Sequence, residues 1–169
     1  MAIGLAQETV ERYVRAGQLL EAPPDLPLEL ATPGAVFVTL RIRGDLRGCV
    51  GTFAPSRPSL AHEIVVAAAS AARHDPRFPP VRPDELASLE YEVSVIESVE
   101  PAASADDLDP KLYGVLVEVD GRHAGLLPGI AGVDTVAEQI AIAREKAGIP
   151  ASCPVRLYRF EVRRYAEPC

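Results

Sequence analysis

A cysteine beside an arginine and two glycines is the part of this chain best suited to chemistry. Cys49 lies in residues 46–52, directly after Gly48 and two positions before Gly51. Glycines inside a strand mark a bulge, or the close approach of a ligand or of another backbone. If the strand is regularly pleated, Arg47 shares a face with Cys49, where its charge favours the reactive thiolate or holds an anion. We therefore predict a site with Cys49 as the candidate catalytic residue and Arg47, Gly48 and Gly51 as binding residues.

Cys49 also has a second interpretation, because free cysteines are among the most buried residues and buried ones are inert. A cysteine nucleophile normally needs a base, and the only histidines are His62, His74 and His123. Each is explained more simply as a surface or half-buried imidazole, because sequence alone does not place a base within reach of a thiol. Functional thiol and core residue both stay open at this point.

A proline-rich loop supplies the second group of candidates. Residues 75–83 contain four prolines. Each proline fixes its own φ and biases the preceding residue towards an extended conformation, so the loop is stiff and can present side chains. We predict that Asp75, Arg77 and Phe78 contribute to binding; the alternative is that they serve the loop alone.

A carboxylate and a hydroxyl in a later strand form the third group. Residues 89–96 alternate, with apolar side chains on one face and Glu90, Glu92 and Ser94 on the other. A carboxylate on a covered sheet face needs a cation or hydrogen-bond donors. We predict Glu92 and Ser94 as binding residues, with Arg47 as the expected partner of Glu92. The alternative is the solvent face of a half-exposed strand.

The rest of the composition argues against a built-in metal or cofactor. Cys49, Cys153 and Cys169 are widely spaced and form no Cys-x-x-Cys pair, which speaks against zinc and disulfide frameworks and favours a reducing cytoplasm. Phosphate-binding loops, zinc-protease motifs and serine-hydrolase motifs are missing. No leader pattern and no apolar run of ~18 residues is present, so we expect neither secretion nor a membrane span.

The charge balance bears on nucleic acid as a partner. The formal net charge is −7, and such a field repels phosphate backbones. Nucleic-acid binding is therefore possible but not favoured, and would depend on a local patch of Arg41, Arg43 and Arg47.

Hydrophobic periodicity and turn residues predict the elements that position these groups. Helices are expected at residues 4–20, 60–72 and 136–147, the last with a capping box at Thr135 and a stop at Gly148. Strands are expected at residues 35–42, 46–53, 89–96, 113–119, 122–127 and 155–165.

This order of elements indicates an α+β fold with a mainly antiparallel sheet, hairpins and packed helices. Residues 1–169 form one domain of ordinary size, with the acidic stretch 97–110 as the expected flexible connection between two possible lobes.

Five motifs in order make the chain resemble the AMMECR domain family, whose bacterial members are called protein A of the AmmeMemoRadiSam system. They are residues 46–52, 75–80, 92–95, 126–128 and 146–148. The resemblance implies two subdomains around a groove, an Arg-Gly-Cys motif as the functional site, and no established activity. It also implies a Memo-like protein and a radical-SAM enzyme as partners.

Three functional hypotheses follow from the residues and the resemblance together. The first is a cytoplasmic ligand- or partner-binding protein with a groove lined by Arg47, Cys49 and Glu92, acting beside the Memo-like and radical-SAM proteins. The second is a thiol-dependent enzyme with Cys49 as nucleophile. The third is the binding or modification of RNA or a nucleotide.

Overall fold

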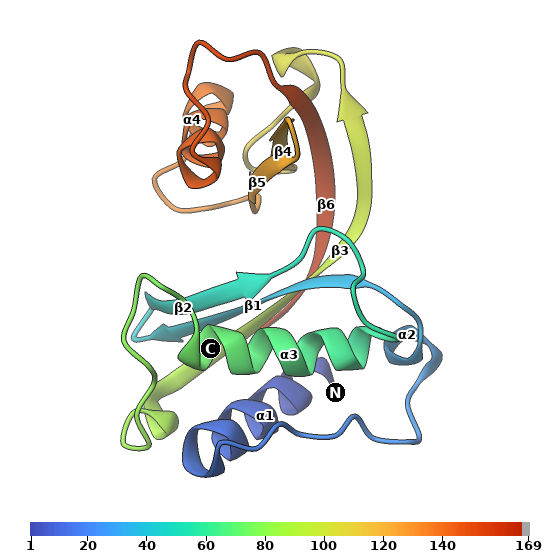
Figure 1. The fold of residues 1–169 in the computed structure, drawn as a ribbon, viewed down its shortest axis with the longest axis vertical. Helices are drawn as coiled ribbons and strands as arrows, with labels where there is room; N and C mark the ends of the chain where they lie inside the picture. The colour runs from blue at the N-terminus through green and yellow to red at the C-terminus, as the bar shows by residue number, and fades with distance from the viewer. Residues whose placement is uncertain (167–169) are drawn as a thin grey trace. The chain divides into compact units, whose positions relative to one another are not determined.

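The computed structural model of the chain describes residues 1–166, and its fold is α+β (Figure 1). Its helices are α1 (Ala2–Ala16), α2 (Leu28–Ala31), α3 (Leu60–Arg73) and α4 (Val136–Ala147), with 3-10 turns at Leu86–Ser88 and Ala105–Asp107. Its strands are β1 (Ala35–Ile42), β2 (Asp45–Gly51), β3 (Leu89–Ala102), β4 (Gly114–Val119), β5 (Arg122–Leu126) and β6 (Arg156–Ala166).

The strands follow the order β2-β1-β3-β6-β4-β5 in one sheet. The β1–β2, β4–β5 and β4–β6 pairings are antiparallel. The chain divides into two compact units, the first made of residues 1–95 and the segment that begins at Arg163, the second of residues 96–162. The first unit contains every residue predicted for the site.

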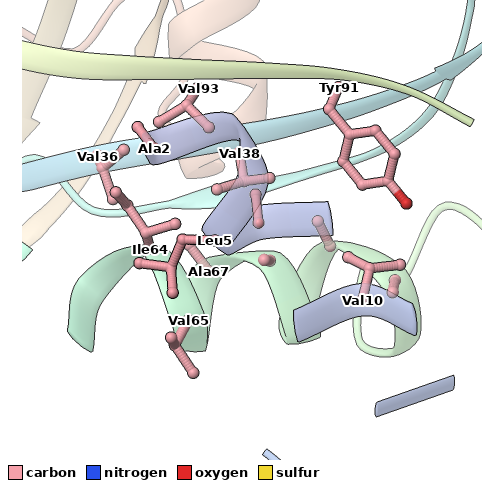
Figure 2. Packing of buried hydrophobic residues seen from close by; sticks show 14 of the residues in the cluster. Ala2, Leu5, Val10, Val36, Val38, Ile64, Val65, Ala67, Tyr91 and Val93 are labelled. Carbon is pink, nitrogen blue, oxygen red and sulfur yellow. The ribbon is translucent and has the colours of Figure 1, made fainter. Parts of the chain in front are cut away.

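In the first unit, α1 and α3 cover one face of the sheet. Strand alternation places Val36 and Val38 of β1 and Val93 of β3 on this face, and all three are fully buried. They pack against apolar side chains of the two helices, among them Val10 and Ile64 (Figure 2). The many alanines of α3 allow its backbone to come close to the sheet.

The second unit has a separate, smaller core beneath α4. Val115 and Val117 of β4 pack with Ala143 of α4. The helix begins after Thr135, whose hydroxyl accepts the Glu138 N–H in the predicted capping box, and it ends at Gly148 with a left-handed φ of 63°.

Most predicted elements are confirmed, with shifts of a few residues at their ends. The clearest correction concerns residues 97–102, which continue β3 instead of forming a connection. Most side chains in this part of β3 are exposed, so hydrophobic alternation does not reveal the strand. Glu100 is held there by an ion pair with Arg159 of β6 at 3.1 Å. The short α2 was also missed, because four residues carry no periodic signal.

Within residues 1–166, no helix has the length and apolar character needed to cross a bilayer.

Candidate functional site

A β-bulge at Arg47 determines how the motif is presented. β2 ends the sheet order, so it is an edge strand. Leu40 pairs with Gly48 and Arg41 pairs with Leu46, which leaves Arg47 as an extra residue in β2. The regular pleat expected from the sequence is therefore interrupted, and Arg47 and Cys49 bond to different residues of the segment 75–85.

The two glycines of the motif accommodate the protein's own backbone. A Cβ atom at Gly48 would overlap the carbonyl oxygen of Ala71 in α3. A Cβ atom at Gly51 would overlap the carbonyl oxygen of Val36 in β1. Of the two explanations for glycine in a strand, close approach of another backbone applies at both positions.

The outward-facing backbone of Cys49 is held by two residues of the proline-rich loop. Its N–H donates to Asp75 Oδ2 at 2.9 Å, and its carbonyl accepts from Arg77 Nη2 at 3.3 Å. An edge strand normally leaves such groups unpaired. Asp75 and Arg77 thus take the place of a further strand at this one residue.

Asp75 is the buried centre of this arrangement, with only 5% of its surface exposed. Besides Cys49 N–H, its carboxylate accepts from the backbone N–H, Nε and Nη2 of Arg77 at 3.1, 2.9 and 2.7 Å. Burial opposes ionisation, but these hydrogen bonds and the Arg77 charge outweigh it and lower the pKa of Asp75 from 3.8 to about 2. Asp75 is therefore a fixed anion at neutral pH.

The Cys49 thiol lies beside Thr39 on the neighbouring strand. Thr39 and Cys49 are paired across β1 and β2, and Thr39 Oγ1 donates to Cys49 Sγ at 3.3 Å. Because the Cys49 backbone bonds to the loop, this is a pair without hydrogen bonds between the two backbones, in which side chains lie closer together. Cys49 is half-buried, whereas Thr39 is 3% exposed.

Arg77 brings a positive charge to the residue that carries this thiol. The pKa of its guanidinium is raised, mainly by the hydrogen bond to Asp75 and against the effect of burial, with a further contribution from the negative charge of Cys49. Coulomb attraction is mutual, so Arg77 favours the thiolate of Cys49. The Arg77 side chain is 51% exposed and its guanidinium also lies 5.5 Å from the Phe78 ring centroid.

Glu92 and Ser94 lie on the same sheet face as Cys49, opposite the helices. Their neighbours Tyr91 and Val93 belong to the core beneath α1 and α3, so alternation turns Glu92 and Ser94 the other way. Ser94 is completely buried and donates to Glu92 Oε1 at 3.1 Å. Cys49, Thr39 and this pair occupy three successive strands, each ~4.8 Å from the next.

The expected ion pair between Arg47 and Glu92 does not form. Glu92 Oε1 lies 3.7 Å from Arg164 Nε instead. Arg47 pairs with Glu85 at 2.8 Å and lowers the pKa of Glu85 to about 2, chiefly through its hydrogen bonds and against desolvation. The bulge accounts for the difference, because it directs Arg47 to the loop rather than along the sheet face.

Other predicted groups lie elsewhere. His62 Nδ1 is 2.7 Å from Ser59 Oγ, and His74 Nε2 is 3.1 Å from the Tyr13 hydroxyl. In the part of the chain that the structure describes, no group of three His, Cys, Asp or Glu residues could hold a metal ion. Cys169 lies outside the described residues.

Of the arginine patch considered for nucleic-acid binding, Arg47 is paired within the protein. Arg47 is directed to Glu85, and Arg41 Nη1 lies 3.4 Å from the Gly44 carbonyl oxygen of its own hairpin. The patch is thereby reduced to Arg41 and Arg43 beside the turn.

Three residues of the site were not singled out from the sequence: Thr39, Glu85 and Arg164. Thr39 could have been sought by counting back from the hairpin turn. A regular count places it opposite Gly48, and only the bulge moves it opposite Cys49.

Comparison with known proteins places the chain in a family. The AMMECR1 family model matches residues 3–166. A Thermotoga maritima protein is 48% identical over 163 residues, covering 95% of this chain and 94% of its own length. A Clostridium acetobutylicum protein is 41% identical over 98% of this chain, which spans only 36% of that longer protein.

The fold agrees with a solved structure as well. The crystal structure of an uncharacterised protein from Pyrococcus horikoshii superposes with a TM-score of 0.88 at 30% identity, covering 99% of this chain and 95% of that one. With the family match over almost its whole length, this chain belongs to the AMMECR1 family.

Proposed function

We propose that this chain is a ligand-binding protein whose ligand lies against the Cys49 thiolate, on the sheet face of the first unit that lies opposite α1 and α3. The observation that carries the proposal is the two-sided attachment of the Cys49 backbone to Asp75 and Arg77. A structural cysteine in a core needs no such attachment, nor a hydroxyl donor at its sulfur.

The surroundings of the sulfur support a thiolate rather than a neutral thiol. Thr39 donates a hydrogen bond to it, and donors stabilise the charged form of an acid. The half-exposed side chain of Arg77 adds a positive charge. A neighbouring cation is a common cause of thiolate formation. Glu92 adds a carboxylate with a partly exposed side chain on the same sheet face, so a polar ligand fits the site better than an apolar one.

A thiol-dependent enzyme is the second candidate, favoured by the same Arg77–Cys49 contact. In this case the Cys49 sulfur forms a bond to an electrophilic carbon of the substrate. The leaving group departs with the electron pair of the bond that breaks. A thiolate already formed at neutral pH needs no histidine base for this step.

Partners enter the proposal through the family resemblance. We propose that a Memo-like protein and a radical-SAM enzyme act with this chain in the cytoplasm. Purified partners mixed with wild-type chain and with Cys49→Ser would test this by sedimentation velocity. A complex between the wild-type chain and either partner supports the proposal. If the wild-type chain forms no complex with the Memo-like protein or with the radical-SAM enzyme, the proposal is contradicted.

Alkylation by iodoacetamide tests the site itself, with Cys153 as a control in the same chain. Both cysteines are half-buried, but Cys153 lies in the second unit, where its sulfur is 3.6 Å from the Pro154 carbonyl oxygen. Mass spectrometry of the two peptides gives separate rates, each normalised to the rate in urea.

We expect normalised alkylation of Cys49 at pH 7 to be on the order of tenfold faster than that of Cys153, since a cation lowers the thiol pKa. Arg77→Gln is expected to slow Cys49 and leave Cys153 unchanged. The proposal would be contradicted if Cys49 is alkylated no faster than Cys153, or if its alkylation rate is the same in Arg77→Gln as in wild type.

A further inference from the structure

Arg47 has all sides of its guanidinium directed at the proline-rich loop. Its Nε and Nη2 donate to the two carboxylate oxygens of Glu85 at 2.8 and 3.0 Å. Its Nη1 donates to the Pro79 carbonyl at 2.9 Å, and Nη2 also lies 3.3 Å from the Pro80 carbonyl oxygen. The side chain is only 13% exposed. An arginine held in this way does not present its charge to a ligand.

The composition of the loop explains why an arginine is needed there. Proline has no backbone N–H, so Pro79 and Pro80 offer only carbonyl oxygens. Attachment of this segment to β2 therefore requires a donor-rich side chain from the strand. Arginine supplies five N–H donors in a planar fork, which lysine cannot reproduce. The bulge at Arg47 directs that fork to the loop.

Two attachments fix the loop along the edge of β2. One end is held where Asp75 and Arg77 bond to the Cys49 backbone. The other is held where Glu85 and the two proline carbonyls bond to Arg47, two residues earlier in the strand. Between them, Val81 N–H donates to the Ala72 carbonyl at 2.8 Å. Release of the Arg47 end leaves Arg77 beside Cys49 with less support.

We infer that Arg47 is a positioning residue, which holds the proline-rich loop so that Arg77 stays bonded to the Cys49 carbonyl and its charge stays near the thiol. This assigns the arginine of the motif a role through Arg77 instead of direct contact with a ligand. The inference rests on the proposed function only for what Cys49 does; the attachment of the loop can be measured independently.

The test combines a double-mutant cycle with hydrogen exchange on the full chain. The variants are Arg47→Met, Arg77→Gln and the double variant, with Arg82→Met as the control in the same loop. Arg82 pairs with Asp84 and its side chain is 70% exposed. Two readouts are taken: the pH midpoint of Cys49 alkylation, and amide exchange of residues 77–85.

Arg47→Met leaves the other charged residues around Cys49 unsubstituted. They are Asp75 and Arg77 of the loop and, on the Cys49 face of the sheet, Arg41 of β1, Glu92 of β3 and Arg164 of β6. A shift of the alkylation midpoint in this variant therefore reports either movement of the loop or loss of the Arg47 charge itself. Arg47→Lys separates these two, because it keeps the charge and loses the fork.

We expect Arg47→Met and Arg47→Lys to speed exchange in residues 77–85 and to slow Cys49 alkylation at pH 7 by roughly threefold to tenfold, as a weakened cation effect predicts. In the Arg77→Gln background, Arg47→Met is expected to cause no further slowing. Arg82→Met changes neither readout.

Three results would overturn the inference: unchanged exchange in Arg47→Met, full rescue by Arg47→Lys, or additive slowing in the double variant. If Arg47→Met does not fold, Glu85→Gln serves as a second variant that keeps Arg47. We expect it to speed exchange in residues 77–85 and to slow Cys49 alkylation. If wild-type Cys49 reacts like an ordinary thiol, the proposed function fails, and hydrogen exchange still decides whether Arg47 holds the loop.

Discussion

Replacement of Asp75 by asparagine removes the anion that joins the loop to the motif. Its pKa falls from 3.8 to about 2 in the folded chain. At about 1.36 kcal/mol per pKa unit, ionised Asp75 stabilises the fold by ~2 kcal/mol. A carboxyl with a lowered folded-state pKa stabilises the fold above its unfolded pKa of 3.8, and this contribution disappears as the pH falls through about 2.

Urea unfolding of wild type and Asp75→Asn at several pH values measures this contribution. We expect a difference of ~2 kcal/mol at pH 7, falling to about half near pH 3, as protonation of the wild-type carboxyl removes its advantage. Asp84→Asn serves as the control, because Asp84 is exposed in its pair with Arg82, and it should leave the unfolding midpoint unchanged. A difference that is the same at pH 7 and pH 3 would refute the assignment of Asp75 as a stabilising anion.

Two further predictions concern backbone packing and helix capping. Gly48→Ala should destabilise the chain by roughly 1–3 kcal/mol, because its Cβ overlaps the Ala71 carbonyl; Gly4→Ala, in open space on α1, should instead stabilise it by about 0.5–1 kcal/mol. Shifts of the urea unfolding midpoint in the same direction for the two variants would contradict this reasoning. Thr135→Ala should cost ~1 kcal/mol and speed amide exchange in the first turn of α4, since it removes the acceptor for Glu138 N–H; unchanged exchange there would argue against the cap.

Elements with local signals could be predicted from the sequence. β1 follows from strict alternation over residues 35–42, and α4 follows from the capping box at Thr135 and the glycine at 148. The β4–β5 hairpin follows from Asp120-Gly121, both of which adopt positive φ values in the structure. Each of these signals lies within a few residues of the element it specifies.

For the candidate site, the sequence indicated some of the residues that meet but not how they pair. Cys49, Asp75 and Arg77 were singled out, and the structure brings them into direct contact. The partners of Arg47 were not found, because Glu85 lies 38 positions away and its capture depends on a bulge. A bulge shifts every cross-strand neighbour by one, so a count from the turn gives the wrong pairing beyond it.

The bulge also explains why the sequence predicts the wrong arginine as the neighbour of Cys49. Arg47 is adjacent in sequence to the glycine before Cys49, which suggested that its charge acts on the thiol. In the fold, Arg47 bonds to Glu85, and Arg77 is the arginine that donates a hydrogen bond to the Cys49 carbonyl. Short sequence separation predicts contact along a regular strand but not across a bulge at an edge.

Ultraviolet titration of the thiolate in wild type against Cys49→Ser is the most direct measurement of the central claim. The difference curve isolates Cys49 from the other two cysteines of the chain. The Thr39 hydroxyl and the Arg77 charge predict a midpoint well below ~8.5, the value for a free cysteine. A midpoint at or above that value would show that Cys49 is an ordinary buried thiol, and the proposed site would be contradicted.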